Sequence, residues 1–205
     1  MKNDYLKYYK PKVLIGIVFL ISLALYYVRD NFSITFSVLG IITLIIITIT
    51  EKLWNKKIFK HLFWIDDFSG RYEGTLIYQY IDEVGEMKTG ELEHIKIIKQ
   101  TGSQIDITSI TKKDDGSLSS PSTNKGMYIE PTPDDQHFIL IYSYLNDGCL
   151  EQEFPPHYGT EVIKFINNGK GKLLSGEYNS DRRPIQTRGK FKNLKWVSNN
   201  TNHDY

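Results

Sequence analysis

Cysteine is almost missing from this chain. Its 205 residues include one, Cys149, so no intrachain disulfide can form. Several enzyme signatures are missing too: the sequence has no GxxxxGK[ST] phosphate loop, no HExxH zinc motif and no GxSxG nucleophile elbow. Adjacent acids at 66–67, 114–115 and 134–135 fall in expected turns or linkers, where solvated carboxylates are the ordinary interpretation. We therefore expect a protein that is not an enzyme and that holds no metal or cofactor.

Two long uncharged runs, residues 13–28 and 32–49, dominate the first quarter of the chain. At a rise of about 1.5 Å per residue they span roughly 24 and 27 Å, and flanking aromatic side chains can complete a bilayer core of about 30 Å. A cleaved signal peptide is disfavoured because no small-residue cleavage site follows the first run. Buried helices of a soluble protein are disfavoured because neither run has a polar face. Residues 1–61 are thus predicted to form a transmembrane hairpin that turns at 29–31.

Basic residues flank this hairpin on one side. Residues 1–61 carry nine Lys and Arg against three Asp and Glu, and Arg29 alone lies between the two runs. The positive-inside rule places both chain termini and the following domain in the cytoplasm, and a basic anchor suits a membrane whose inner surface is anionic. Thr35, Ser37, Gly40 and Thr43 give the second run small or hydroxylated positions. Such positions favour close helix packing, either in self-association or against the first run.

Residues 62–198 show period-2 alternation interrupted by turn residues, such as Asn168-Gly169-Lys170-Gly171. Residues 199–205 form a polar tail. Eight antiparallel strands favour a closed up-and-down barrel, because closure removes exposed edges; a β-sandwich is the alternative. Such a barrel either holds one small ligand or is filled by side chains. The expected strands cover residues 69–82, 88–100, 104–111, 126–130, 137–145, 160–167, 172–179 and 188–197.

Tyrosine is abundant, with 14 residues in the chain. Five lie at strand positions from which they can line a cavity and stack on flat rings: Tyr72, Tyr78, Tyr142, Tyr144 and Tyr178. The other interpretation is that these tyrosines simply fill the barrel. Both remain open at this point.

Basic charge gathers near the end of the domain. Residues 62–163 carry 7 basic and 18 acidic side chains, whereas residues 164–205 carry nine basic and three acidic ones. Arg182 and Arg183 fall in the loop before the last strand and Arg188 begins that strand, and guanidinium forks match phosphate oxygens. We expect an anionic ligand at one barrel mouth. A solvated basic face, or one that touches anionic lipid, is the alternative.

Two motifs support a resemblance to a known family. Trp64-Ile65-Asp66-Asp67-Phe68-Ser69-Gly70-Arg71-Tyr72-Glu73-Gly74 opens the barrel, and Gly176-Glu177-Tyr178, Arg182-Arg183 and Gly189 lie near its end. With the strand order and spacing, they make nearly the whole chain resemble the two-transmembrane, β-strand-rich effectors of bacterial CBASS anti-phage systems, the SMODS-associating family. Lipocalin-like barrels also open with a Gly-x-aromatic-x-Gly pattern, so the resemblance implies a lipocalin-like barrel.

The resemblance also implies a function. Such an effector is a receptor for a cyclic nucleotide, with a cyclic dinucleotide as the expected form; binding drives oligomerisation, disruption of the inner membrane and abortive infection. The expected partners are this messenger, the bilayer and further copies of the chain, with no DNA or RNA. A membrane-tethered barrel for a lipid or other apolar ligand and a structural docking subunit are the alternatives. The expected ligand-binding residues are Tyr72, Tyr78, Tyr142, Tyr178, Arg182, Arg183 and Arg188.

Overall fold

The computed structural model describes residues 4–32, 35–113, 116–148, 155–169 and 171–202. Cys149, Lys170, part of the expected turn at 113–116 and the end of the polar tail therefore lie outside the described residues. The chain divides into two compact units, one of residues 1–67 with 100–105 and one of residues 68–99 with 106–205. We describe each unit by itself.

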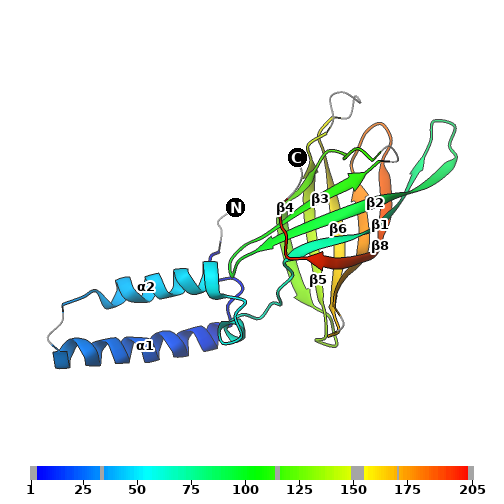
Figure 1. Ribbon diagram of the computed structural model, residues 1–205. Coiled ribbons are helices and arrows are strands. Elements are labelled where there is room, and N and C mark those ends of the chain that lie inside the picture. Colours follow the sequence, from blue (N-terminus) through cyan, green and yellow to red (C-terminus); the bar gives the residue numbers. More distant parts are fainter. Residues whose placement is uncertain (1–3, 33–34, 114–115, 149–154, 170, 203–205) are drawn as a thin grey trace. The chain divides into compact units, whose positions relative to one another are not determined.

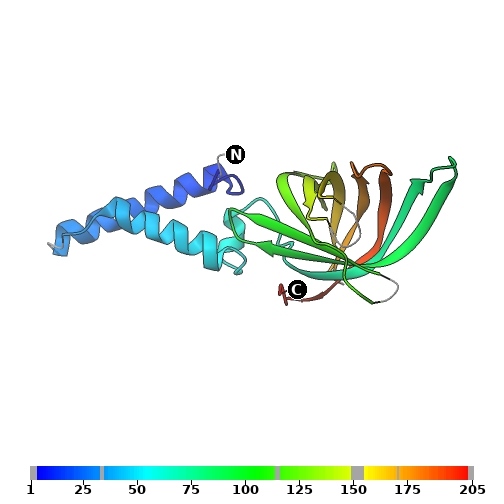
Figure 2. The same ribbon diagram turned by 90° about the horizontal axis from the view of Figure 1, so that it is seen from above.

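The first unit is helical. It contains α1 (Pro11–Phe32), α2 (Val38–Thr48), the π-helical turn η1 (Ile49–Leu53) and the 3₁₀ turn η2 (Phe59–Leu62). Helix α1 is long and apolar enough to cross a membrane, by length and composition. Figures 1 and 2 show α1 and α2 running side by side, and apolar side chains such as Ile17, Ile21, Ile42 and Ile46 line the narrow space between them.

The helix boundaries differ from those expected, and the turn predicted at 29–31 is wrong. These residues belong to α1, where the Asn31 side-chain amide donates to the Tyr27 carbonyl oxygen at 2.9 Å and continues the helical pattern. The second helix begins at Val38 rather than at 32, because the Ser37 hydroxyl accepts the Gly40 amide proton at 3.1 Å and caps it. Residues 33–34 of the expected second run are outside the described residues.

The second unit is a closed barrel in which strand order follows the chain from β1 to β8. This confirms an eight-stranded antiparallel barrel and excludes the sandwich. Strand β4 is longer than expected and β6 begins three residues earlier. The strands are β1 (Gly70–Ile81), β2 (Met87–Gln100), β3 (Ile105–Lys112), β4 (Ser122–Pro131), β5 (Phe138–Asn146), β6 (His157–Asn167), β7 (Lys172–Ser180) and β8 (Thr187–Ser198).

Closure depends on the pairing of β1 with β8. Leu76 lies opposite Phe191 and Tyr80 opposite Thr187 in this antiparallel pair. Close backbone approach requires glycine at Gly176, where a Cβ atom would lie 2.1 Å from the Val162 carbonyl oxygen. The strand register around the barrel therefore decides which side chains lie at the same level of the interior.

The interior changes character from one end of the barrel to the other. Along the β5–β6 pair, Phe138 lies opposite Phe165, Leu140 opposite Ile163, Tyr142 opposite Glu161, Tyr144 opposite Gly159 and Asn146 opposite His157. The first two pairs are apolar and the last ones are polar or lack a side chain. One half of the barrel is therefore a packed core, and the other half is less completely filled.

Phe68 plugs the packed half. Its side chain is fully buried, and its ring meets those of Phe165 and Phe138 edge to face, with centroids 4.7 and 5.5 Å apart. Leu174 and Leu194 are also fully buried there. This end of the barrel is closed by side chains.

Replacing Phe68 by alanine should lower the free energy of unfolding by about 3–5 kcal/mol, because the surrounding rings cannot collapse fully into the space. Urea unfolding of the full-length protein in detergent, followed by near-ultraviolet circular dichroism, measures the loss. The control is Tyr128→Ala on the outer face, where the side chain is 62% exposed and the cost should stay below about 0.5 kcal/mol. Equal effects of the two substitutions would contradict the plug.

Candidate functional site: a cavity in the open half of the barrel

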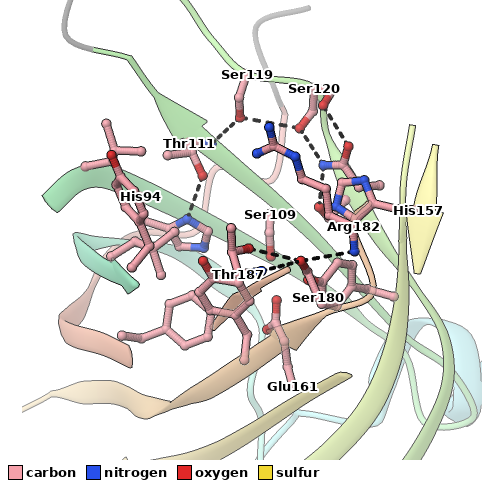
Figure 3. Close-up of a pocket in the computed structure, with 18 of the residues that line it drawn as sticks. His94, Ser109, Thr111, Ser119, Ser120, His157, Glu161, Ser180, Arg182 and Thr187 are labelled. Atoms are coloured by element: carbon pink, nitrogen blue, oxygen red, sulfur yellow. Dashed lines mark hydrogen bonds between the residues drawn. The ribbon is translucent and has the colours of Figure 1, made fainter. Parts of the chain in front are cut away.

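A cavity of about 460 Å³ occupies the half of the barrel opposite the Phe68 plug. This volume is within the range of about 300–1,000 Å³ that is usual for small-molecule sites. Figure 3 shows side chains from several strands and loops converging on it. Its lining comprises Leu76, Tyr78, Tyr80, Leu92, His94, Ser109, Thr111, Lys113, Ser119, Ser120, Ser122, Tyr144, Asn146, His157, Glu161, Tyr178, Ser180, Arg182, Ile185, Thr187 and Phe191.

Aromatic rings form much of the cavity wall. Tyr78 and Tyr80 project to the same side of β1 and their rings stack nearly parallel at 6.3 Å. Tyr178 on β7 packs against Phe191 on β8, with centroids 5.9 Å apart. Burial raises the pKa of Tyr178 and raises the pKa of Tyr144 further, so both hydroxyls stay protonated. These walls offer flat faces together with hydroxyl groups.

The mouth is polar and carries positive charge. Arg182, Lys113 and His157 line it from three different segments. Partial burial lowers the pKa of Arg182 from its ordinary value, and the neighbouring Tyr178 and Tyr80 oppose that shift. Asn146 adds a fixed amide, since its carbonyl oxygen accepts from the Ser120 hydroxyl at 2.8 Å and its NH₂ group donates to Ser122 at 2.9 Å. The mouth therefore presents cations and hydrogen-bonding groups to an entering ligand.

A buried ion pair lies beneath the cavity. The Lys96 ammonium is fully buried and donates to Glu161 Oε2 at 2.8 Å and to the Ser109 hydroxyl at 2.5 Å. The Tyr142 hydroxyl donates to the same Glu161 oxygen, and the ammonium also lies 4.5 Å from the centre of the Phe191 ring. Glu161 and Ser109 line the cavity, whereas Lys96 does not.

The pKa shifts in this network follow from burial. Desolvation lowers the pKa of Lys96, while the carboxylate and hydrogen bond of Glu161 raise it in part. Desolvation raises the pKa of Tyr142 well above its ordinary value, and the charge of Glu161 acts in the same direction. Tyr142 therefore remains a hydroxyl donor. At the cavity floor Glu161 is paired with Lys96, which lies behind it and does not line the cavity.

His94 stands beside this network on β2. Its Nδ1 atom lies 3.2 Å from the Thr111 hydroxyl and its ring lies 4.9 Å from that of Phe191. Among the residues that the structure describes, its buried Nε2 atom has no hydrogen-bond partner. Burial and the nearby Lys96 charge lower the pKa of His94 well below its ordinary value. His94 is therefore a neutral imidazole with one nitrogen left for a ligand.

Three of the seven residues expected to bind ligand line the cavity: Tyr78, Tyr178 and Arg182. Tyr144, the fifth tyrosine that we considered, lines it too.

The other four do not line it. Tyr72 is fully buried in the packed half, where its hydroxyl donates to the Phe68 carbonyl oxygen at 2.7 Å. Tyr142 lies one layer beneath the cavity, in the Lys96 network. Arg183, in the loop before β8, and Arg188 are both exposed. Arg188 points outward because alternation along β8 turns Thr187 inward and the next residue outward. Position along a strand therefore predicts which tyrosines face the barrel interior, but not how far each lies from the cavity.

Sequence reasoning missed Glu161, His94 and Ser109. The first had a usable signal, since it shares its strand face with Ile163 and Phe165, which are both buried. His94 had none, because both faces of β2 are buried there and alternation is lost. A period-2 pattern cannot show which side chains face the interior where both faces of a strand are buried.

No family model, curated protein or solved structure matches this chain. Across the described residues, no three or more His, Cys, Asp or Glu side chains gather in a group that could hold a metal ion. The arguments about function therefore rest on the cavity and on the charges around it. That the protein is not an enzyme stays a prediction.

Replacing Lys96 by methionine should lower the free energy of unfolding by about 3–5 kcal/mol, because Glu161 would keep a buried charge without its partner. The double substitution Lys96→Met with Glu161→Leu should recover much of the loss, since it removes both charges. Urea unfolding of the full-length protein measures each. The control Lys190→Met breaks the exposed Lys190–Glu177 pair and should leave the unfolding midpoint nearly unchanged. If the double variant is no more stable than Lys96→Met, the unpaired charge of Glu161 is not the cause of the loss.

Stability should also fall in mild acid because of His94. An unfolded histidine takes up a proton near pH 6.5, whereas folded His94 resists protonation. Stability is thus fully present above about pH 6.5 and is lost below it, by up to about 1.4 kcal/mol per pH unit. Urea unfolding of wild-type protein and His94→Gln from pH 7.5 to pH 5 should show a shallower loss in the variant. The control His61→Gln, at an exposed position, should keep the wild-type slope.

Proposed function

We propose that the protein is a membrane-anchored receptor and effector of CBASS anti-phage defence, and that a cyclic nucleotide, most simply a cyclic dinucleotide, binds in the barrel. Binding drives self-association of the chain, and the N-terminal helices then disrupt the bacterial inner membrane and cause abortive infection. In this proposal the barrel is of the up-and-down, lipocalin-like kind, and both termini and the barrel lie in the cytoplasm.

The observation that carries the proposal is the composition of the cavity. Flat aromatic walls at Tyr78, Tyr178 and Phe191 suit nucleobases, and Arg182 at the mouth suits phosphate oxygens. The volume of about 460 Å³ supports a small-molecule ligand. A cyclic nucleotide joins flat bases to anionic phosphates and needs both kinds of surface.

The alternatives are less well supported by the same cavity. A lipid or other apolar ligand would leave Glu161 Oε1 and the unpartnered His94 nitrogen without a hydrogen-bond donor or acceptor in the cavity. A barrel that serves only as a docking subunit would have no need of a hollow half. The polar floor and the charged mouth together favour a ligand that is both aromatic and anionic.

The proposed membrane part uses both helices. Helix α1 has 22 residues, and α2 with η1 covers residues 38–53, about 24 Å at the rise of an α-helix. The second segment is short for a bilayer core of about 30 Å. Tyr26 and Tyr27 near the end of α1 are 58% and 67% exposed and suit the membrane interface. Short spans that thin the bilayer locally are consistent with a role in membrane disruption.

The cavity predicts different roles for two adjacent arginines. Arg182→Glu should weaken binding of a cyclic dinucleotide by about 10- to 100-fold, because it replaces a charge-assisted hydrogen bond at the mouth by repulsion. The matched control Arg183→Glu changes charge identically, but its side chain is 82% exposed and lies outside the cavity, so affinity should change less than threefold. Isothermal titration of full-length protein in detergent, first with a panel of cyclic di- and trinucleotides, measures both.

If no cyclic nucleotide in the panel binds the wild-type protein, the proposed function fails. If both variants weaken binding equally, the phosphates contact the basic loop from outside and the cavity is not the site.

Membrane insertion is tested at the centre of α1. The double substitution Leu20→Arg with Leu23→Arg should release the chain from carbonate-washed membranes or cause its degradation, because two arginines near the bilayer centre cost about 5–7 kcal/mol. The control Ile81→Arg with Met87→Arg adds the same charge at exposed barrel positions, 60% and 58% accessible, and should leave the chain in the membrane. Retention of both variants in the membrane fraction would be evidence against the span.

A further inference from the structure

The floor of the cavity presents acceptors of hydrogen bonds. Glu161 lines the cavity, and in the described part of the chain its hydrogen bonds and ion pair all use Oε2. The second carboxylate oxygen, Oε1, is therefore left to accept from a ligand. His94 adds the Nε2 atom, which has no partner among the described residues although its side chain is only 4% exposed. A buried polar atom without a partner in the wall of a cavity indicates a place that a ligand satisfies.

The two ends of the cavity present different groups to a ligand. Lys96 balances the charge of Glu161 from behind but is 0% exposed, so a ligand on the floor contacts the carboxylate and not the ammonium. His157 lies four residues from Glu161 on β6, about 13 Å along the strand, at the mouth with Lys113 and Arg182. An anionic group therefore meets an acceptor oxygen and no cation at the floor, whereas the cations of Lys113 and Arg182 attract it at the mouth.

Between these ends the cavity is lined by flat rings. Tyr178 lies opposite Glu161 in the β6–β7 register, and Phe191 lies within 4.9 Å of His94 and 5.9 Å of Tyr178 between ring centres. Figure 3 shows Glu161, Ser109 and His94 directed into this space, with Arg182 and Ser120 toward its other side. A planar group that stacks on these rings brings its edge to the floor.

We propose that this floor is a subsite selective for amino-bearing nucleobases, in which Glu161 Oε1 and His94 Nε2 accept from the N–H edge of the base, with His94 in the tautomer whose Nδ1 carries the proton and donates to the Thr111 hydroxyl. The nucleotide is bound base first, and its phosphates stay at the mouth beside Arg182. Guanine, adenine and cytosine carry an amino group for such an acceptor. Uracil and hypoxanthine keep one ring N–H but have a carbonyl oxygen or a hydrogen atom in place of the amino group. That the ligand is a nucleotide rests on the proposed function. That the floor accepts hydrogen bonds does not.

The test compares ligands that differ in one amino group. Cyclic di-GMP and cyclic di-AMP are each titrated against cyclic di-IMP, which lacks the amino group of both, with full-length protein in detergent. The better of the two amino-bearing ligands should bind at least about tenfold more tightly than cyclic di-IMP, because hypoxanthine keeps one ring N–H but lacks the amino group, so one of the two floor acceptors is left without a donor. Equal affinities would overturn the subsite and leave the proposed receptor function standing.

A variant tests the residues without relying on a fragile fold. Glu161→Gln alone strands the Lys96 charge, so Lys96→Met with Glu161→Leu is used beside it. In the double variant the affinity ratio between amino-bearing and amino-free ligands should fall to within about twofold. His94→Gln, whose amide can still meet a base edge, should reduce the ratio only in part. An unchanged ratio in the double variant means that Glu161 does not read the base.

A fragment pair separates this inference from the proposed function. 2-Aminopurine and purine differ in one amino group and carry no phosphate. At millimolar concentration, ligand-observed NMR should detect 2-aminopurine on the wild-type protein more strongly than purine, and this preference should vanish in the double variant. If the fragments discriminate while no cyclic nucleotide binds, the receptor function fails and the acceptor floor stands. If neither fragments nor nucleotides discriminate, the acceptor floor is overturned.

Discussion

The ion pair of Lys96 and Glu161 at the middle of the barrel is the interaction on which the rest of the interior depends. Both side chains are almost completely withdrawn from solvent, so each needs the other and the hydroxyls of Ser109 and Tyr142 to compensate the loss of hydration. Apolar side chains pack on one side of this layer and a cavity lies on the other. Apolar side chains in place of this ion pair would need no compensation for lost hydration. A charged layer is suited to face a polar ligand.

The same layer relates the packed half to the hollow one. Phe191 contacts the Lys96 ammonium, packs against His94 and Tyr178, and lines the cavity. Its place opposite Leu76 follows from the β1–β8 pairing that closes the barrel. The β1–β8 register therefore closes the sheet, and it also sets the position of the charged layer and the shape of the cavity wall. The resulting site has acceptors at its floor, rings at its wall and cations at its mouth.

Much of this architecture could be predicted from the sequence, because alternation or Gly-containing turns mark most of the strands and eight strands favour closure. The position of a side chain along the barrel axis could not be predicted. Tyr72 and Tyr78 share one strand face, yet one fills the core and the other lines the cavity. Lys96, flanked by Ile95 and Ile97, reads as an outward cation on an apolar strand. In the structure Lys96 points into the barrel, and the two isoleucines pack with Ile110 on the other face of the strand. Likewise the charges at 29–31 suggested a loop where the helix continues.

The most direct test of the central claim, that the hollow half of the barrel is the ligand site, is a structure of the full-length protein in detergent with a bound cyclic dinucleotide. The account predicts ligand density inside the barrel, with a base edge against Glu161 and His94, its ring beside Tyr178 and Phe191, and a phosphate next to Arg182. Density on the outer face of the barrel, or a base at the mouth with a phosphate against Glu161, would contradict it.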